Sequence, residues 1–240
     1  MAPAGRPHRI RRRARPAGAG NATNRHEGTR QEGTRKEEQG EPVGGVSLTK
    51  GGNVSLTKQA PDLTVVTVGL GWRARRTTGA AFDLDASALL TDSRGKVLSD
   101  LHFVFFNNLT SPDGSVTHLG DELVGSSDEG GGGAGDAEEI RVDLAGLAPE
   151  VAKVVFPVSI YEAESRQQNF GQVSQAYIRI IDQADGRELA RYDLTEDASS
   201  ETAMVFGELY RHAGEWKFRA IGQGYASGLR GIALDYGVNV

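Results

Sequence analysis

From about Val46 onward, apolar and polar residues alternate in short runs, a pattern that predicts β-strands. Clusters of Gly, Asp, Asn and Pro separate the runs, and Asp185-Gly186 predicts a hairpin turn between two of them. The runs expected as strands are 63–72, 82–91, 102–106, 140–144, 154–161, 176–182, 188–194, 204–211 and 216–221. Strands of this length and spacing favour an all-β sandwich or barrel.

Helical signals are few. We expect one short helical turn near 149–153 and one helix at the C-terminus, over 228–236. A tandem copy of Val-Ser-Leu-Thr-Lys occupies 46–50 and 54–58, on either side of Gly-Gly-Asn. Its alternation of β-branched and polar residues suggests an edge strand.

The N-terminal segment has a different composition. Residues 1–42 hold ten of the 27 Lys and Arg and five of the 32 Asp and Glu, which leaves 17 basic and 27 acidic residues for the rest. Ile10 is its only large apolar residue after Met1, so it cannot bury enough surface to offset the entropy of ordering. We therefore expect a disordered basic extension over 1–45 and one acidic β domain over 46–240. The extension is either a dispensable addition or an arm for nucleic acid or an anionic surface.

Several chemistries are excluded by composition. The chain has no cysteine, so it has no disulfide, thiolate metal site or cysteine nucleophile. It has no apolar run of about 18 residues that could span a membrane. The glycine run 130–133 is not followed by the Gly-Lys-Ser/Thr of a phosphate-binding loop. We therefore expect no enzyme activity.

Candidate chemistry begins in Phe82-Asp-Leu-Asp-Ala-Ser87. In a strand, Phe82, Leu84 and Ala86 face the core while Asp83, Asp85 and Ser87 face the other way. Aspartate is a poor strand former, and two like charges roughly 7 Å apart on one face repel each other. A divalent cation would relieve that repulsion; the alternative is a solvated polar face.

A second acidic group follows. Seven carboxylates lie within 121–139, around the glycine run: Asp121, Glu122, Asp128, Glu129, Asp136, Glu138 and Glu139. Asn107 and Asn108 end a predicted strand and can add carbonyl oxygens. A donor set of oxygens without sulfur or imidazole fits calcium best. The spacing is not that of an EF-hand, so separated loops would have to build any calcium site. The alternative is that the acidic loop binds no ion and only aids solubility.

Taken together, the motifs resemble the TerD family of tellurium-resistance and stress-response proteins. The resemblance rests on a collinear set that covers about 46–240: the tandem 46–58, Gly69-Leu-Gly-Trp72, Phe82-Asp-Leu-Asp-Ala-Ser87, Phe106-Asn-Asn-Leu109, and the segments 169–173, 190–194, 207–211, 216–219 and 222–225.

The resemblance implies a two-sheet β-sandwich that binds calcium. The implied ligands are Asp83, Asp85, Asn107, Asn108, Asp121, Asp136, Glu138 and Glu139. It also implies a cytoplasmic bacterial stress protein that associates with the inner face of the membrane through other Ter-type proteins. Arg73 and Ala137 stand where the family usually has acids, which removes charge and favours one site over two.

We therefore expect a calcium-binding, non-enzymatic stress-response protein whose ion orders a surface for partners. One alternative is a metal-dependent phosphoester hydrolase that uses the same carboxylates, with Arg73 as the nearest basic residue. Another is a scaffold that binds nucleic acid or anionic lipid through the basic extension. The acidic body itself disfavours nucleic acid.

Overall fold

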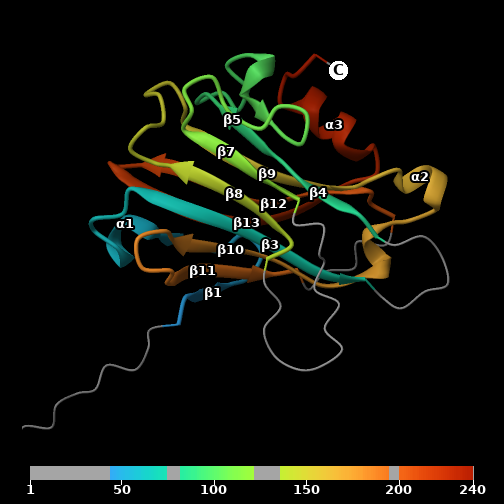
Figure 1. The fold of residues 1–240 in the computed structure, drawn as a ribbon, viewed down its shortest axis with the longest axis horizontal. Coiled ribbons are helices and arrows are strands. Elements are labelled where there is room, and N and C mark those ends of the chain that lie inside the picture. Colours follow the sequence, from blue (N-terminus) through green and yellow to red (C-terminus); the bar gives the residue numbers. More distant parts are fainter. Residues whose placement is uncertain (1–43, 75–81, 122–135, 195–199, 240) are drawn as a thin grey trace, which may run out of the picture. The chain divides into compact units, whose positions relative to one another are not determined.

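The computed structural model describes residues 44–74, 82–121, 136–194 and 200–239 (Figure 1). The chain divides into two units, residues 1–41 and 42–240. The first unit, and with it nearly all of the extension expected over 1–45, lies outside the described residues. The description below concerns the second unit.

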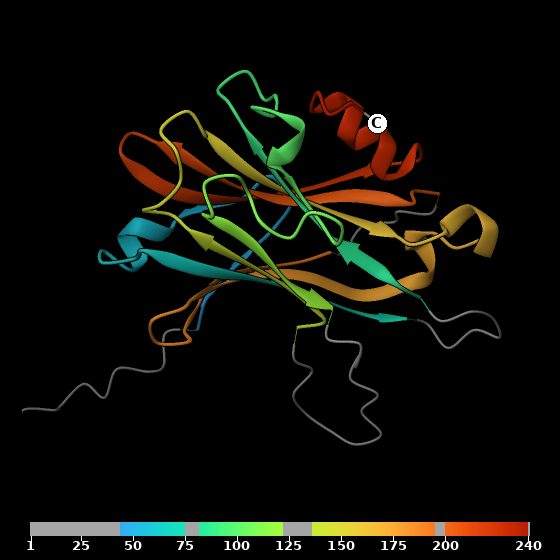
Figure 2. The same cartoon turned by 45° about the horizontal axis from the view of Figure 1, so that its top comes forward.

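Two sheets build this unit. Sheet A has the order β1-β11-β10-β3-β8-β7, and sheet B has the order β2-β13-β12-β9-β5-β6, with β4 also paired to β9. The strands of sheet A are β1 (Val46–Leu48), β11 (Glu188–Asp193), β10 (Val173–Asp182), β3 (Val65–Ala74), β8 (Glu138–Asp143) and β7 (Val116–Asp121). Those of sheet B are β2 (Asn53–Ser55), β13 (Glu215–Tyr225), β12 (Ala203–His212), β9 (Lys153–Ile160), β5 (Ala88–Thr91), β6 (Phe103–Val104) and β4 (Leu84–Ala86). The expected all-β, two-sheet sandwich is confirmed (Figure 2).

The helices are short. They are α1 (Leu56–Gln59), α2 (Ala163–Arg166), α3 (Gly228–Asp235) and the 3₁₀ turns η1 (Asp100–His102) and η2 (Phe170–Gln172). The expected C-terminal helix is therefore present as α3. The short helical turn expected near 149–153 is present only as a single turn, in which the Val151 N–H donates to the Ala148 carbonyl at 3.0 Å, and β9 begins at Lys153. Among the described residues, no helix is long and apolar enough to cross a membrane.

The two copies of the tandem repeat 46–58 pair with different sheets. Its first copy pairs in parallel with β11 of sheet A, and its second copy pairs antiparallel with β13 of sheet B. Gly51 and Gly52 join the two copies and bond to Ala220 of β13, at 2.9 Å each. The same five residues therefore cover one edge of each sheet, and the second copy ends in α1, whose N-terminus is capped by Ser55.

The strand expected over 82–91 is interrupted once. Ala86 lies opposite Val158 and Leu89 opposite Val155, so β4 and β5 keep one register along β9. The gap falls at Ser87, opposite Pro157, because proline has no N–H to donate to the ladder. Both the N–H and the hydroxyl of Ser87 donate to the Pro157 carbonyl, at 2.9 and 3.2 Å.

The strand expected over 102–106 was also wrong in extent. Only Phe103 and Val104 form β6, and a tight turn follows in which Phe105 and Asn108 exchange backbone hydrogen bonds of 3.0 and 2.8 Å. Thr110 then bridges to Thr117 of β7. The chain thus passes directly from the edge of sheet B to the edge of sheet A and closes this side of the sandwich.

The main core lies between the sheets. Its largest fully buried side chains are Phe156, Tyr192, Phe206 and Phe218. A second apolar layer lies on the other face of sheet B, where α3 packs. That layer explains why Ser87, expected on the polar face, is only 2% exposed.

One loop on the sandwich is held by a single carboxylate. Asp113 Oδ1 accepts from the Ser111 and Ser115 hydroxyls, both at 2.6 Å, and Oδ2 accepts from the Ala148 N–H at 3.3 Å. Partial burial opposes ionisation, but these hydrogen bonds outweigh it and lower the pKa of Asp113 to about 2. Asp113 thereby ties the turn before β7 to the turn after β8.

Candidate metal site at the corner of β4, β7 and β8

Three strand ends that carry predicted ligands meet at one corner of the sandwich. Asp121, the last residue of β7, lies opposite Glu138, the first residue of β8. A register shift after His118 makes this pairing possible, and Gly120 takes a positive φ of 92° there. β4 of sheet B lies against β8 of sheet A. The fold therefore places β4 next to β8, whose first residue pairs with the last residue of β7.

A buried histidine joins the three strands. His118 is 3% exposed, and its Nε2 lies 3.2 Å from the Ala86 carbonyl oxygen and 3.1 Å from Glu138 Oε2. Its Nδ1 accepts from the Gly120 N–H at 3.1 Å. Because Nδ1 is an acceptor, the proton of the neutral ring is on Nε2, facing the carbonyl and the carboxylate. Sequence reasoning missed His118 because no second imidazole at ligand spacing accompanies it.

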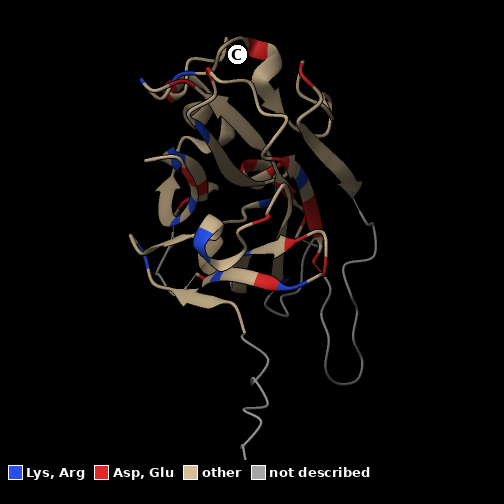
Figure 3. Ribbon diagram, turned by 90° about the vertical axis from the view of Figure 1, so that its left-hand side faces the viewer, with Lys and Arg blue, Asp and Glu red and all other residues tan. Residues whose placement is uncertain are grey.

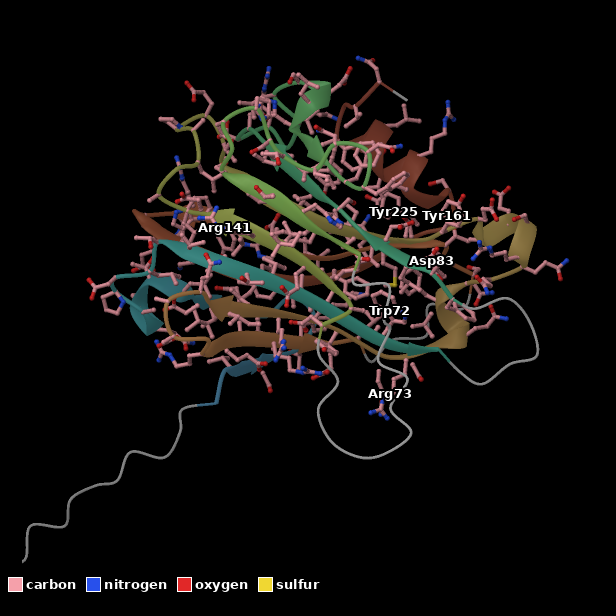
Figure 4. All side chains as sticks on the ribbon, viewed as in Figure 1. Trp72, Arg73, Asp83, Arg141, Tyr161 and Tyr225 are labelled. Carbon is pink, nitrogen blue, oxygen red and sulfur yellow. The ribbon has the colours of Figure 1, made fainter. Side chains whose placement is uncertain are left out.

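Asp83 and Asp85 flank Leu84 on the side of β4 that faces away from the main core. Leu84 and Ala86 are each 1% exposed, which confirms the predicted alternation of faces. Asp83 is exposed and Asp85 half-buried. The Asp83 carbonyl accepts from the Tyr161 N–H at 2.8 Å, and the two residues lie close together in Figure 4.

The two asparagines occupy the turn after β6. Asn107 is exposed, whereas Asn108 is half-buried. The Asn108 amide nitrogen donates to the carbonyls of Leu101 and Phe103, at 3.0 and 2.7 Å. Its side chain therefore holds the turn together, which gives Asn108 a structural role whatever else it binds.

Glu138 and Glu139 point to opposite faces of sheet A. Glu138 is 4% exposed and faces the inside of the sandwich with His118, while Glu139 is half-buried on the outer face. In the outer row Glu139 lies opposite Gly69 of β3, and Gly69 lies opposite Arg179 of β10.

Asp136 has a set of partners unlike those of the other predicted ligands. Its carboxylate is fully buried and accepts from Arg179 Nε, at 2.8 and 3.0 Å, and from the Tyr177 hydroxyl at 2.9 Å. Burial and the Asp136 charge raise the pKa of Tyr177 to about 12, so the phenol remains a donor. Burial opposes the charge of Arg179, yet its pairing with Asp136 raises the pKa of the guanidinium.

Glycines make room for this arrangement. A Cβ on Gly69 would lie 1.9 Å from Asp136 Oδ2, and one on Gly71 would lie 2.4 Å from the Tyr177 ring. The glycines of Gly69-Leu-Gly71 lie within a strand, which is itself a sign of close approach by another group. That signal could have pointed to the Asp136 contacts from sequence.

The described side chains include no group of three or more His, Asp or Glu already gathered around one point. The Asp121 side chain and all of 122–135, including Glu122, Asp128 and Glu129, lie outside the described residues. The donor chemistry of the corner nevertheless fits a hard cation, since it consists of carboxylate and amide oxygens from strand ends.

The architecture defines a class of protein, a two-sheet β-sandwich whose strands pair mostly antiparallel. Residues 45–236 match the family model of the TerD domain, and the chain belongs to the TerD family of tellurium-resistance and stress-response proteins. The expected resemblance is thereby confirmed.

Relatives and solved structures agree with this assignment. The chain is 58% identical to tellurium resistance protein TerD of Serratia marcescens over 81% of its own length and 98% of that protein. It is 50% identical to general stress protein 16U of Bacillus subtilis, with the same coverage. The crystal structure of a TerD homologue from Streptomyces coelicolor A3(2) matches with a TM-score of 0.54 and 26% identity, over 71% of this chain and 95% of that one.

Proposed function

We propose that this protein is a non-enzymatic, calcium-binding member of the TerD family, in which the ion binds at the corner of β4, β7 and β8. The observation that carries the proposal is the pairing of Asp121 with Glu138 beside β4, because it gathers acidic residues from three separate segments. The proposed ligands are Asp83, Asp85, Asn107, Asp121 and Glu138, whereas Glu139 lies on the outer face of sheet A and is left out of the set. Calcium would supply positive charge that offsets their mutual repulsion.

The repulsion argument favours calcium over a simply solvated face. Glu138 is nearly inaccessible to water, so solvation by bulk water contributes little to stabilising its charge. Calcium accepts six to eight oxygens in irregular geometry, which suits ligands from separated strand ends better than the tighter octahedron of magnesium.

The alternative functions have less support. The hydrolase alternative needs a basic residue beside the ion, but Arg73 is exposed at the end of β3 and points away from Asp83 in Figure 4. The scaffold alternative places nucleic acid or anionic lipid on the basic extension, which lies outside the described residues; along the described strands, acidic and basic residues lie next to one another and form no positive field (Figure 3).

Calorimetry on the full chain tests the proposal. After treatment with EDTA, the protein is titrated with calcium and, separately, with magnesium. We expect heat and a raised melting temperature with calcium, and loss of both in Asp83→Asn/Asp85→Asn. The control Asp62→Asn/Glu164→Gln removes the same charge from exposed positions and should bind like the wild type. No heat and no melting shift at millimolar calcium would reject the proposal.

For the cell, we propose a cytoplasmic protein that meets other Ter-type stress proteins, at the inner face of the membrane, through the calcium-ordered corner. The support is family membership, since TerX and TerZ of Serratia marcescens are also relatives, at 40% and 38% identity. In a bacterium that lacks its own TerD-family genes, the wild-type chain should raise survival on tellurite and Asp83→Asn/Asp85→Asn should not. Equal survival with the wild type and with the double variant would show that tellurite resistance does not depend on calcium binding at Asp83 and Asp85.

A further inference from the structure

Asp136 is the first described residue of the chain that runs into β8. Its carboxylate is fully buried on the outer face of sheet A, over Gly69. The next residue, Ala137, donates its N–H to the Leu70 carbonyl at 2.8 Å. Glu138 then lies opposite Leu70, and Glu139 opposite Gly69. The position of Asp136 therefore sets where β8 joins β3.

We infer that Asp136 is a positioning residue, held by Arg179 and Tyr177, which fixes Glu138 for the ion and is not itself a calcium ligand. Where calcium is concerned, the inference rests on the proposed function. It departs from the expectation that the family resemblance gave for Asp136.

The contacts support this role. Both carboxylate oxygens of Asp136 already accept from the Arg179 Nε–H, and one also accepts from Tyr177. A cation bound to this carboxylate would lie beside the guanidinium and be repelled by it. Arg179 also approaches Glu188 Oε2 at 3.5 Å, and Arg191 stacks over the Tyr177 ring at 3.8 Å. Neighbours on β11 therefore contact both groups that bind Asp136.

Strand alternation explains how a residue on the outer face can affect an inner ligand. With Asp136 fixed, Glu138 faces His118 inside the sandwich and Glu139 faces outward. A slip of β8 by one residue would exchange these faces and move Glu138 away from the corner. Asp136 thus acts on the proposed site through the backbone register.

The variant Arg179→Gln separates the two roles by the sign of its effect. If Asp136 positions the ligands, we expect calcium binding to weaken at least about tenfold, as for other groups that orient metal ligands. If Asp136 is a ligand, the substitution frees its carboxylate and removes a repelling charge, so binding should tighten. Arg179→Lys keeps the charge without the guanidinium fork and should restore part of the affinity. Tighter binding in Arg179→Gln would overturn the inference.

Arg94→Gln is the control for loss of one positive charge, because exposed Arg94 pairs with Asp92 and belongs to none of the contacts described for Asp136, Arg179 and Tyr177. Its calcium affinity should stay within about twofold of the wild type.

Hydrogen exchange on the calcium-free protein tests positioning independently of calcium. The Ala137 amide should exchange about tenfold faster or more in Arg179→Gln and in Tyr177→Phe, but not in Arg94→Gln. Unchanged Ala137 protection would overturn the positioning role. If the wild type binds no calcium, the proposed function fails while the exchange data still decide whether Asp136 fixes β8.

Discussion

Gly69→Ala places a methyl group where the Asp136 carboxylate now lies. The new Cβ would be 1.9 Å from Oδ2 and 2.3 Å from Cγ of Asp136. Because these distances are far below van der Waals contact, the carboxylate must leave its position. It then loses its bonds to Arg179 and Tyr177.

The expected loss of stability follows from those contacts. Breaking a buried ion pair costs about 3–5 kcal/mol, although Arg179 is 27% exposed and can recover some hydration. Alanine in place of glycine returns roughly 0.4–1 kcal/mol by restricting the unfolded chain. We therefore expect Gly69→Ala to lower the free energy of unfolding by about 2–4 kcal/mol.

A double-mutant cycle in urea assigns this loss to one contact. Unfolding midpoints are measured for the wild type, Gly69→Ala, Asp136→Ala and the double variant, with the m-value as a check on two-state behaviour. In the Asp136→Ala background the clash is gone, so Gly69→Ala should be neutral or slightly stabilising, with a coupling of about 2 kcal/mol or more. The same loss in both backgrounds would show that the Asp136 contact is not the reason for the glycine.

Three further predictions concern other parts of the sandwich. The folded-state pKa of Asp113 lies below its ordinary value of 3.8, so its contribution is complete above that pH and lost as pH falls toward about 2. Asp113→Asn should therefore lower stability at pH 7 by roughly 1 kcal/mol, discounted for exposure, and flatten acid unfolding between pH 4 and 2; an unchanged acid limb would contradict this. Glu208 is 4% exposed and pairs with Lys153 and Arg219, at 3.1 and 3.2 Å. Glu208→Ala should lower the free energy of unfolding in urea by about 1–3 kcal/mol, and Glu208→Gln should lower it by less. Ser87→Ala removes the 3.2 Å bond to the Pro157 carbonyl and should cost about 0.5–1.5 kcal/mol in thermal unfolding, whereas a neutral result would assign that position to packing alone.

Local patterns were sufficient for most of the strands. The residue patterns in 63–72, 176–182 and 188–194 predicted β3, β10 and β11. The ends of these strands in the structure differ from the predicted ends by a few residues at most. The Asp185-Gly186 turn followed from local chemistry, since Gly186 takes a positive φ of 72°. The helices α1 and α2 were missed because four residues are too few for a helical period to show.

Part of the candidate site could also be read from the sequence. The alternation in Phe82-Asp-Leu-Asp placed Asp83 and Asp85 on the face away from the core, and strand spacing excluded a contiguous calcium loop. Glycines within the run 69–71 carried a signal of close approach, but the sequence could not say which group approaches.

The sequence alone therefore determined most of the strands, although not β7, and most of their buried faces, although not that of Ser87, because these depend on residues near each other along the chain. Only the tertiary structure decided that Asp121 meets Glu138, that His118 bridges Ala86 and Glu138, and that Asp136 binds Arg179. Those contacts join residues that lie far apart along the chain or on different strands. Long-range register, a strand bulge and the closure of the two sheets fix them, and none of these leaves a periodic trace in the sequence.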